Sequence, residues 1–394
     1  MEPRRRILIL PSWYPPDGGY FFKEHCEAIQ KMGWDVDVLV NRVVGIRKLV
    51  QVGIQALRRY RVHDENGLRV ARSVYLKIPG SEKQNIRNWS KQTRKRYSRY
   101  EQEFGKPDLI LAHSVTWAGY AAWLIREKHG VPYLVVEHRS YFVWSTPQAR
   151  NMVKPYHLPF YEMAYKNCEK LVLVSGSLKT GLKALMPWIE EKTMVIPNMI
   201  REDMFLLPPE PRKTDPFIFF WAGRLEHVKG IDLLLEAVRL LKQKTRQPFR
   251  VRLAGKGRLR AELEQQAEAL GVDDHVKFLG RISREAMQRE MQGASCFVLP
   301  TRYEAFGAVL IEAMASGLPV IATRSGGPDS IVTKENGLLI DPENAGQLAG
   351  AMEQMITDHS AYSAESIRKQ AMDRYGQTRV MEQYHDLFLQ LLEQ

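Results

Sequence analysis

The sequence predicts an α/β protein with two doubly wound domains in tandem, and three observations support this. Its 394 residues are too many for one ordinary domain and comfortable for two. Short apolar runs alternate with helix-length segments, the pattern of parallel strands joined by crossover helices. Hydrophobic residues make up 44% of the chain and charged residues 26%, which is the balance of a globular protein.

In the first half, the apolar runs predict buried strands at 7–10, 36–40, 109–112, 133–136 and 171–174, and a helix at 21–32. The second half repeats the pattern. It predicts strands at 217–221, 250–254, 276–279, 296–299 and 319–322, and helices at 231–244, 259–270, 284–292 and 309–316. Two successive α/β units are therefore expected.

A proline cluster suggests where the units divide. Pro208, Pro209 and Pro211 lie within 198–215, a composition typical of a linker. We expect a first domain at 1–200, a second at 201–378, and a last helix at 379–394. That helix has an apolar stripe that can pack on either domain, including back on the N-terminal one.

Several protein classes are excluded by composition. No apolar run approaches the roughly 18 residues of a membrane-spanning helix. The basic start at 4–6 leads into an apolar run that Pro11 ends too early for a secretory signal. Three scattered cysteines, Cys26, Cys168 and Cys296, form neither a disulfide framework nor a zinc set. We expect a cytoplasmic protein.

The positive charge is confined to the first half. Residues 1–200 hold 32 basic and 18 acidic side chains, a net charge of +14, whereas 201–394 hold 25 and 27, a net charge of −2. Within 42–99 there are 16 basic and three acidic residues. This asymmetry favours an anionic partner: nucleic acid, anionic lipid or a phosphate-bearing acceptor. A solvated basic face is the alternative. Because no groove-reading motif is present, we expect no nucleic acid.

Two basic segments suit a membrane surface. In 45–61 an apolar stripe, including Ile46, Val50 and Ile54, is decorated by basic residues such as Arg58. In 83–100 basic residues are interleaved with Trp89, Tyr97 and Tyr100. Basic amphipathic helices with interfacial aromatics bind anionic membranes. Alternatively, each apolar stripe packs on its own sheet.

Two motifs carry the chemistry. Glu304 and Glu312 flank a segment that leads from a predicted strand into a predicted helix, so its backbone N–H groups would offer a phosphate site. Arg224 and Lys229 follow another strand and precede another helix. Two cations there can neutralise a diphosphate as it leaves. The simpler alternative for Arg224 and Lys229 is an ordinary basic loop. For Glu304 and Glu312 it is a surface helix that happens to carry two glutamates.

Together these motifs resemble the retaining glycosyltransferases of GT-B fold, family 4. The resemblance covers essentially the whole chain. It rests on Gly-Arg-x4-Lys-Gly at 223–230, the twin-glutamate motif at 304–312, Gly18-Gly19 after the first strand, and Glu137-His138 at the end of a later strand. It implies two Rossmann-like domains facing across a cleft, with the acceptor bound by the N-terminal domain and the donor by the C-terminal domain.

The resemblance also implies roles for single residues. Arg224 and Lys229 would bind the donor diphosphate, Glu304 the donor sugar and Glu312 the ribose hydroxyls. His138 would contact the donor sugar from the acceptor side, which makes His138, Glu304, Arg224 and Lys229 the catalytic set. The rest of the donor site would comprise Gly18, Gly19, Gly255, Arg281, Ala305, Phe306, Gly307, Ala308 and Val309.

The implied reaction transfers a sugar, with retention, from a nucleotide-diphosphate donor to an acceptor hydroxyl. A UDP-sugar is the expected donor, and a lipid-linked or glycan acceptor in cell-surface polysaccharide assembly is the expected acceptor. The basic N-terminal domain would attach peripherally to the inner face of the cell membrane. A nucleotide-sugar epimerase of the same two-domain fold is the alternative.

Neither a metal nor another cofactor is expected. Asp35 and Asp37 look like the metal-binding dyad of the other glycosyltransferase fold, but they lie in a strand pattern and are interpreted as its polar face. His25 and His113 have no ligand spacing and are interpreted as structural histidines.

Overall fold

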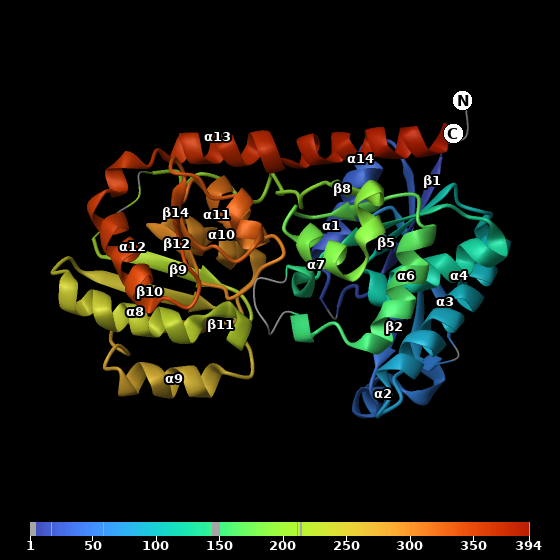
Figure 1. Cartoon of the computed structure of the whole chain (residues 1–394), viewed down its shortest axis with the longest axis horizontal. Helices are drawn as coiled ribbons and strands as arrows, with labels where there is room; N and C mark the ends of the chain where they lie inside the picture. The colour runs from blue at the N-terminus through green and yellow to red at the C-terminus, as the bar shows by residue number, and fades with distance from the viewer. Residues whose placement is uncertain are drawn as a thin grey trace.

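Two separate β-sheets organise the chain (Figure 1). The computed structural model describes residues 5–16, 18–57, 59–143, 150–210, 212 and 215–393. The first sheet has eight strands in the order β3-β4-β2-β1-β5-β6-β7-β8, and the second has six in the order β11-β10-β9-β12-β13-β14. Neighbouring strands are parallel except for the antiparallel pair β3 and β4. The predicted α/β class with two doubly wound units is confirmed.

The N-terminal unit, blue to green in Figure 1, supplies the eight-stranded sheet. Its strands are β1 Arg6–Pro11, β2 Asp35–Val44, β3 Arg61–Glu65, β4 Leu68–Leu76, β5 Leu109–His113, β6 Tyr133–Glu137, β7 Leu171–Leu173 and β8 Thr193–Val195. Its α-helices include α1 Tyr20–Lys31, α2 Ile46–Val52, α3 Glu82–Phe104, α4 Tyr120–His129, α6 Leu158–Asn167 and α7 Leu178–Leu185. The central strands β1, β5, β6 and β7 are buried along nearly their whole length, as parallel strands covered on both faces should be.

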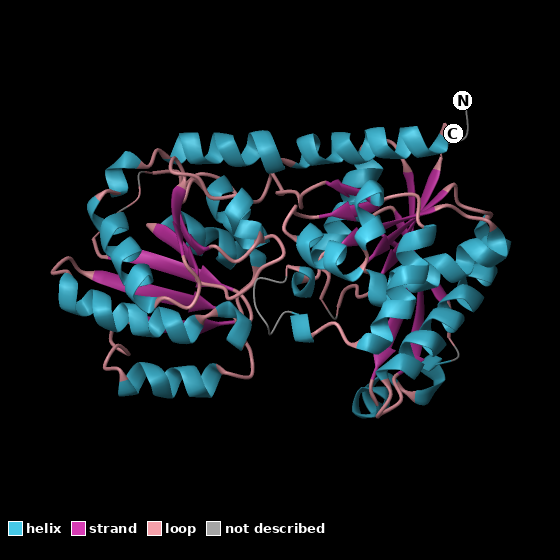
Figure 2. Cartoon of the chain, in the orientation of Figure 1, coloured by secondary structure: helices cyan, strands magenta, loops and turns pink. Residues whose placement is uncertain are grey.

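The C-terminal unit, yellow-green to red in Figure 1, supplies the second sheet. Its strands are β9 Phe217–Ala222, β10 Phe249–Ala254, β11 Val276–Gly280, β12 Cys296–Leu299, β13 Val320–Thr323 and β14 Gly337–Ile340. Its helices include α8 Ile231–Lys244, α9 Arg260–Ala269, α10 Arg284–Gly293, α11 Ala308–Ala315, α12 Ala345–Thr357 and α13 Ala364–Tyr375. Helices lie around both sheets (Figure 2).

The chain ends in α14, Gln377–Leu392, which follows α13 almost end to end along one side of the molecule (Figure 1). Helix α13 packs on α11 of the C-terminal unit, whereas α14 packs on α1 of the N-terminal unit. The indole Nε1 of Trp34 donates to His385 Nδ1 at 3.1 Å, and Phe388 is buried in this contact. The last helix therefore ties the two units together.

The hairpin β3–β4 was missed by the apolar pattern. Its turn is Asn66-Gly67, with positive φ angles of 61° and 82° at the two positions. Asn-Gly favours this type of two-residue turn and was the available signal. The hairpin lengthens the first sheet beyond β2 and places part of the basic region 42–99 on strands rather than helices.

The two basic helical segments differ in exposure. Trp89, Tyr97 and Tyr100 on α3 are buried against the N-terminal sheet, so of the two alternatives, packing on the sheet is observed for this segment and interfacial aromatics are not. The apolar residues of α3 are spaced along one face of the helix, and the sheet covers that face, so they belong to the core. On α2, by contrast, Ile46 is 57% exposed and Val50 82% exposed. Arg58, the side chain of Ile54 and the linker residue Pro211 lie outside the described residues.

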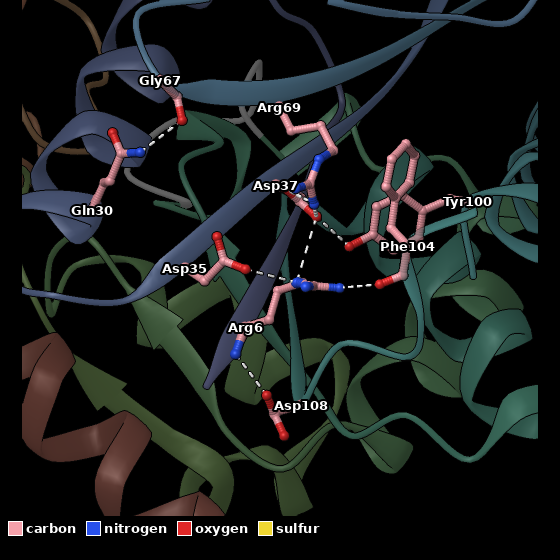
Figure 3. Close-up of polar contacts among 9 residues, drawn as sticks. All are labelled: Arg6, Gln30, Asp35, Asp37, Gly67, Arg69, Tyr100, Phe104 and Asp108. Carbon is pink, nitrogen blue, oxygen red and sulfur yellow. Dashed lines mark hydrogen bonds and ion pairs between the residues drawn. The ribbon is translucent and has the colours of Figure 1, made fainter. Parts of the chain in front are cut away.

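The acidic pair at the start of β2 is held by arginines (Figure 3). Arg6 Nε lies 2.8 Å from Asp35 Oδ2, and Arg69 Nη1 lies 2.8 Å from Asp37 Oδ2. The hydroxyl of Tyr100 donates to Asp37 at 2.6 Å. Both carboxylates thus serve the packing of β2. Across the described part of the chain, no group of three or more His, Cys, Asp or Glu side chains could hold a metal ion.

Among the residues described, none of the helices combines the length and the apolar character needed to cross a bilayer.

Candidate functional site

Two loops of the C-terminal unit meet at an ion pair. One follows β9 and the other follows β12, and these strands are neighbours in the sheet, so both loops leave the same edge. Lys229 Nζ lies 2.5 Å from Glu304 Oε2. Their side chains are 20% and 15% exposed, so the pair is largely shielded while still reaching solvent. The structure thus brings together one cation and one carboxylate from the two predicted motifs.

The turn that carries Lys229 is fixed by close backbone contact. Gly230 has a φ of 66°, and a Cβ added there would lie 1.9 Å from the carbonyl oxygen of Pro300 in the second loop. Only glycine allows both the left-handed backbone and this approach. The amide of Arg302 donates to Val228 O at 2.9 Å, which joins the loops again.

Arg302 clamps the two loops together, a role that sequence reasoning missed. Its guanidinium pairs with Asp232 on α8 at 2.7 Å and with Glu343 beyond β14 at 3.0 Å, and its own side chain is 7% exposed. A buried arginine with two carboxylate partners is held in one geometry. The sequence signal available was the acidic residue in the first turn of α8, but its partner lies 70 positions away.

Glu304 is held in turn by a short bridge to the loop after β13. Its amide donates to Ser325 O at 2.9 Å, and its carbonyl accepts from Gly327 N at 2.8 Å. The carboxylate oxygen Oε1 accepts from the amide of Ala305 at 3.1 Å. The backbone at Glu304 is therefore anchored on both sides, which leaves Oε2 facing Lys229.

The segment after Glu304 ends in a helix N-terminus. Gly307 caps α11 with a φ of 96°, a conformation that favours glycine. Ala305 and Phe306 are buried, whereas Ala308 is exposed and Val309 partly exposed. The first amides of a helix lack acceptors within it and attract anions. Among the predicted donor residues, 306–309 therefore present N–H groups that suit sugar or phosphate oxygens.

Glu312 lies on α11 near charges from both units. Burial raises its pKa to about 7, an effect opposed by the charge of Arg284 on α10 and reinforced by that of Glu24 on α1. Arg284 Nη2 also lies 2.8 Å from Glu24 Oε1, so an ion pair crosses between the units here. Sequence reasoning did not identify Glu24 or Arg284.

Three predicted glycines lie where backbones approach closely or turn left-handed. Gly18 has a φ of 113°. At Gly19, with a φ of 74°, a Cβ would lie 2.7 Å from Trp13 O. At Gly255, with a φ of 151°, a Cβ would lie 1.8 Å from Gly223 O. Gly18 and Gly19 are in the loop between β1 and α1, and Gly255 follows β10, so each lies at the carboxyl end of a strand, where open α/β sheets bind ligands.

His138 follows β6 and is oriented by the buried carboxylate of Glu137. That carboxylate accepts from the amides of Val115, His138 and Arg139 at 3.1, 3.0 and 3.0 Å, and from the hydroxyl of Tyr165 at 3.0 Å. Four donors at one carboxylate fix the turn after β6. Burial lowers the pKa of His138 to about 3, with smaller contributions from His25 and Arg139, so the imidazole is neutral near pH 7.

Three histidines form a row behind this turn. His138 Nε2 lies 3.1 Å from His113 Nδ1, and His113 Nε2 lies 3.4 Å from His25 Nδ1. Burial lowers the pKa of His25 to about 4 and also lowers that of His113. The three therefore form a neutral row. Their sequence positions lie 25 and 88 residues apart, so no local spacing connects them.

Two of the predicted cations are exposed to solvent. Arg224 is 74% exposed and pairs with Glu226 at 3.0 Å. Arg281 is exposed immediately after β11. The N-terminal unit instead reaches the twin-glutamate loop through Ser175, whose hydroxyl donates to the carbonyl of Ala305. Ser175 and its neighbour Ser177 were not identified from the sequence.

Two family profiles match the chain in succession. The one described as "Glycosyltransferase Family 4" matches residues 19–203, and the one described as "Glycosyl transferases group 1" matches residues 205–377. The chain is 27% identical to a putative teichuronic acid biosynthesis glycosyltransferase of Bacillus subtilis, TuaC, over 88% of each chain. It is 30% identical to an uncharacterized glycosyltransferase of Methanocaldococcus jannaschii over 57% of this chain, and spans only 60% of that relative's length.

Solved structures share the fold over nearly the whole chain. A sucrose-phosphate synthase from Thermosynechococcus elongatus superposes with a TM-score of 0.80 at 22% identity, covering 99% of this chain and 100% of that one. HepE of Anabaena, solved in complex with UDP-glucose, superposes with a TM-score of 0.69 at 20% identity, covering 97% and 99%. The two α/β sheets thus match GT-B structures.

Proposed function

The chain belongs to glycosyltransferase family 4 and transfers sugar from a nucleotide-sugar donor, and from that premise we propose its donor, acceptor and site. The donor is a UDP-sugar, and transfer proceeds with retention at the anomeric carbon. The acceptor is a lipid-linked or glycan hydroxyl in cell-surface polysaccharide assembly. Residues 1–200 form the acceptor domain and 201–378 the donor domain.

The observation that carries this proposal is the Lys229–Glu304 contact of 2.5 Å at the edge where two neighbouring strands end. In the proposed site, Lys229 and Arg224 bind the donor diphosphate and Glu304 contacts the donor sugar. Arg224 is exposed in the structure, so it would exchange Glu226 for phosphate when the donor binds. Cations at the leaving group stabilise the charge that develops on it in the transition state.

The proposed mechanism is a same-face substitution. The bond between the anomeric carbon and the diphosphate oxygen breaks, the acceptor oxygen attacks from the same face, and the departing diphosphate takes the acceptor proton. Lys229 and Arg224 stabilise that diphosphate. Burial keeps His138 neutral, so it would not act as a cation. It would instead donate a hydrogen bond to a sugar hydroxyl or accept one from it. The amides of 306–309 would hold sugar and phosphate oxygens, with Gly18, Gly19, Gly255 and Arg281 completing the donor site.

A screen of nucleotide sugars tests the donor. Ligands that bind only the folded state raise its melting temperature, so UDP-sugars should shift the Tm and GDP-sugars should not. Product analysis with the ligand that binds should then show transfer only when an acceptor is added. A larger shift with a GDP-sugar would contradict the proposed nucleotide. Release of a free, altered sugar nucleotide would identify an epimerase instead.

Glu312 makes donor binding depend on pH. We expect the Kd for UDP-glucose to rise about tenfold between pH 8 and pH 6, because a carboxyl with a pKa of about 7 becomes protonated and loses the charge that strengthens its hydrogen bonds from the ribose hydroxyls. Calorimetric titration across this range measures it. The variant Glu312→Gln should bind weakly at both pH values and show a nearly flat profile. A profile in Glu312→Gln as steep as the wild type would assign the pH dependence to another group.

We also propose that α2 attaches the N-terminal domain to anionic membrane at the inner face of the cell membrane. Ile46 and Val50 are exposed, Arg47 beside them is exposed, and each basic residue near an anionic surface contributes about 1 kcal/mol. The double variant Ile46→Glu/Val50→Glu should lose most co-sedimentation with anionic vesicles. Met163→Glu, at a 43% exposed apolar site on α6, is the matched control. If the wild-type protein sedimented with neutral vesicles as well as with anionic ones, the proposed attraction between the basic residues and anionic lipid would be contradicted.

A further inference from the structure

A basic cavity lies in the N-terminal unit, apart from the Lys229–Glu304 pair. Its volume is about 330 Å³. Four arginines and one histidine line it: Arg42, Arg59, Arg61, Arg72 and His63. Among the lining residues that the structure describes there is no carboxylate. Val40, Val74 and Ala56 supply apolar wall beside this charge.

Strand register explains why the arginines gather here. Val40 and Arg42 are two positions apart on β2 and therefore share a face. On β4, Arg72 pairs with Val40, and on β3 Arg61 pairs with Arg72. The hairpin β3–β4 thus brings its arginines beside the carboxyl-terminal half of β2. Arg59 comes from the segment that joins α2 to β3.

Arg72 is the fixed member of the cluster. Its guanidinium pairs with Glu65 at 2.6 Å, donates to Pro15 O at 2.9 Å and lies 5.3 Å from the ring centre of Tyr14. Arg59 and Arg61 are exposed, and Arg59 donates to the neutral side chain of Gln55 at 2.8 Å. The cavity therefore has a rigid inner wall and two adaptable cations at its rim.

The cavity lies at the edge of the N-terminal sheet where its parallel strands end. A smaller cavity of about 80 Å³ shares Arg42 and Arg72 with it and adds Trp13. The Trp13 ring packs on Phe22 with centroids 5.1 Å apart, and Phe22 packs on His138 at 5.3 Å. Trp13 also contacts the Gly19 turn. A group held among the arginines would therefore lie at the same edge of the sheet as His138.

We propose that this cavity binds the phosphate or diphosphate group of the acceptor and so orients the acceptor hydroxyl toward His138. Guanidinium groups match phosphate oxygens with paired N–H donors, and several arginines around one cavity suit a doubly charged group. The apolar walls accommodate the carbon portion next to the phosphate. This inference rests on the proposed glycosyl transfer and names the chemical class of its acceptor.

The test uses the full-length protein saturated with UDP, so that the donor diphosphate site is occupied. Calorimetry then measures the binding of inorganic pyrophosphate, glucose 1-phosphate and farnesyl diphosphate. Arg59→Gln/Arg61→Gln should weaken binding of the preferred probe at least about tenfold, because a hydrogen bond to a charged group is lost at each position. Arg246→Gln, at an exposed arginine between α8 and β10, is the charge-matched control and should bind like the wild type.

The three probes distinguish the source of the phosphate. Tighter binding of farnesyl diphosphate than of pyrophosphate assigns a lipid-linked acceptor, and tighter binding of glucose 1-phosphate assigns a soluble sugar phosphate. Unchanged affinity in Arg59→Gln/Arg61→Gln, or no binding of any probe by the UDP-saturated protein, would overturn the inference. Absence of UDP binding itself would contradict the proposed donor, so the two failures are separable.

Discussion

Replacement of Lys229 by alanine is expected to lower kcat by about 10²–10³, the typical loss when one charge-stabilising contact is removed from a transition state. Glu304→Gln should cause a loss of similar size, because the amide keeps the shape but removes the charge opposite Lys229 at 2.5 Å. Steady-state transfer assays under saturating donor measure both. Donor binding should fall less than kcat, since the contact strengthens as the diphosphate departs.

Lys242→Ala is the matched control for this pair of variants. Lys242 lies on α8, the helix that follows Lys229, but it faces solvent and pairs with Asp274 at 3.2 Å. Its loss should leave kcat unchanged, because exposed ion pairs contribute little. The melting temperatures of Lys229→Ala and Glu304→Gln should stay near that of the wild type. Near wild-type turnover in either variant would remove that residue from the catalytic set.

Gly230→Ala is expected to damage both stability and activity. The added Cβ would lie 1.9 Å from Pro300 O, a backbone atom that cannot swing away, so the two loops must separate. Lys229 is the adjacent residue, and a displacement of about 1 Å at a catalytic group can cost about 10² in rate. Thermal unfolding and transfer assays measure the two effects.

Gly271→Ala is the control that separates two effects of Gly230→Ala: the strain of the left-handed backbone and the collision of the new Cβ with Pro300 O. Gly271 has nearly the same φ, 64° against 66°, but a Cβ there meets nothing within 4 Å. Both variants incur the left-handed cost of about 1–2 kcal/mol, and only Gly230→Ala incurs the overpacking cost of about 1–3 kcal/mol or more. Equal melting temperatures and equal activities in the two variants would show that the contact with Pro300 does not position Lys229.

The elements that the sequence predicted well are those with a strong local pattern. Helix α8 was predicted as 231–244 and is observed as Ile231–Lys244, because its apolar stripe faces one side throughout. Buried parallel strands such as β1 and β12 were found as short apolar runs. The hairpin β3–β4 was not, because β3 is mostly charged and arginines interrupt the apolar residues of β4, which leaves the Asn66-Gly67 turn as the local signal.

The same division holds for the site. The residue types and order of the motifs at 223–230 and 304–312 indicated phosphate and sugar chemistry, since cations, carboxylates and a glycine at a helix start suit those ligands. Local sequence could not indicate that Arg302 clamps both loops or that His25 and His113 join His138, because these contacts link residues far apart in the chain.

By itself, then, the sequence determined the α/β class, the two successive units and the motifs that a nucleotide-sugar enzyme needs, since each depends on the periodicity or chemistry of neighbouring residues. Only the tertiary structure decided which charged groups meet. The aromatic residues of α3 became core because a sheet covers them, while the arginines of β2, β3 and β4 gathered around one cavity because strand register places them side by side. Such outcomes depend on pairing across a sheet, which no local pattern encodes.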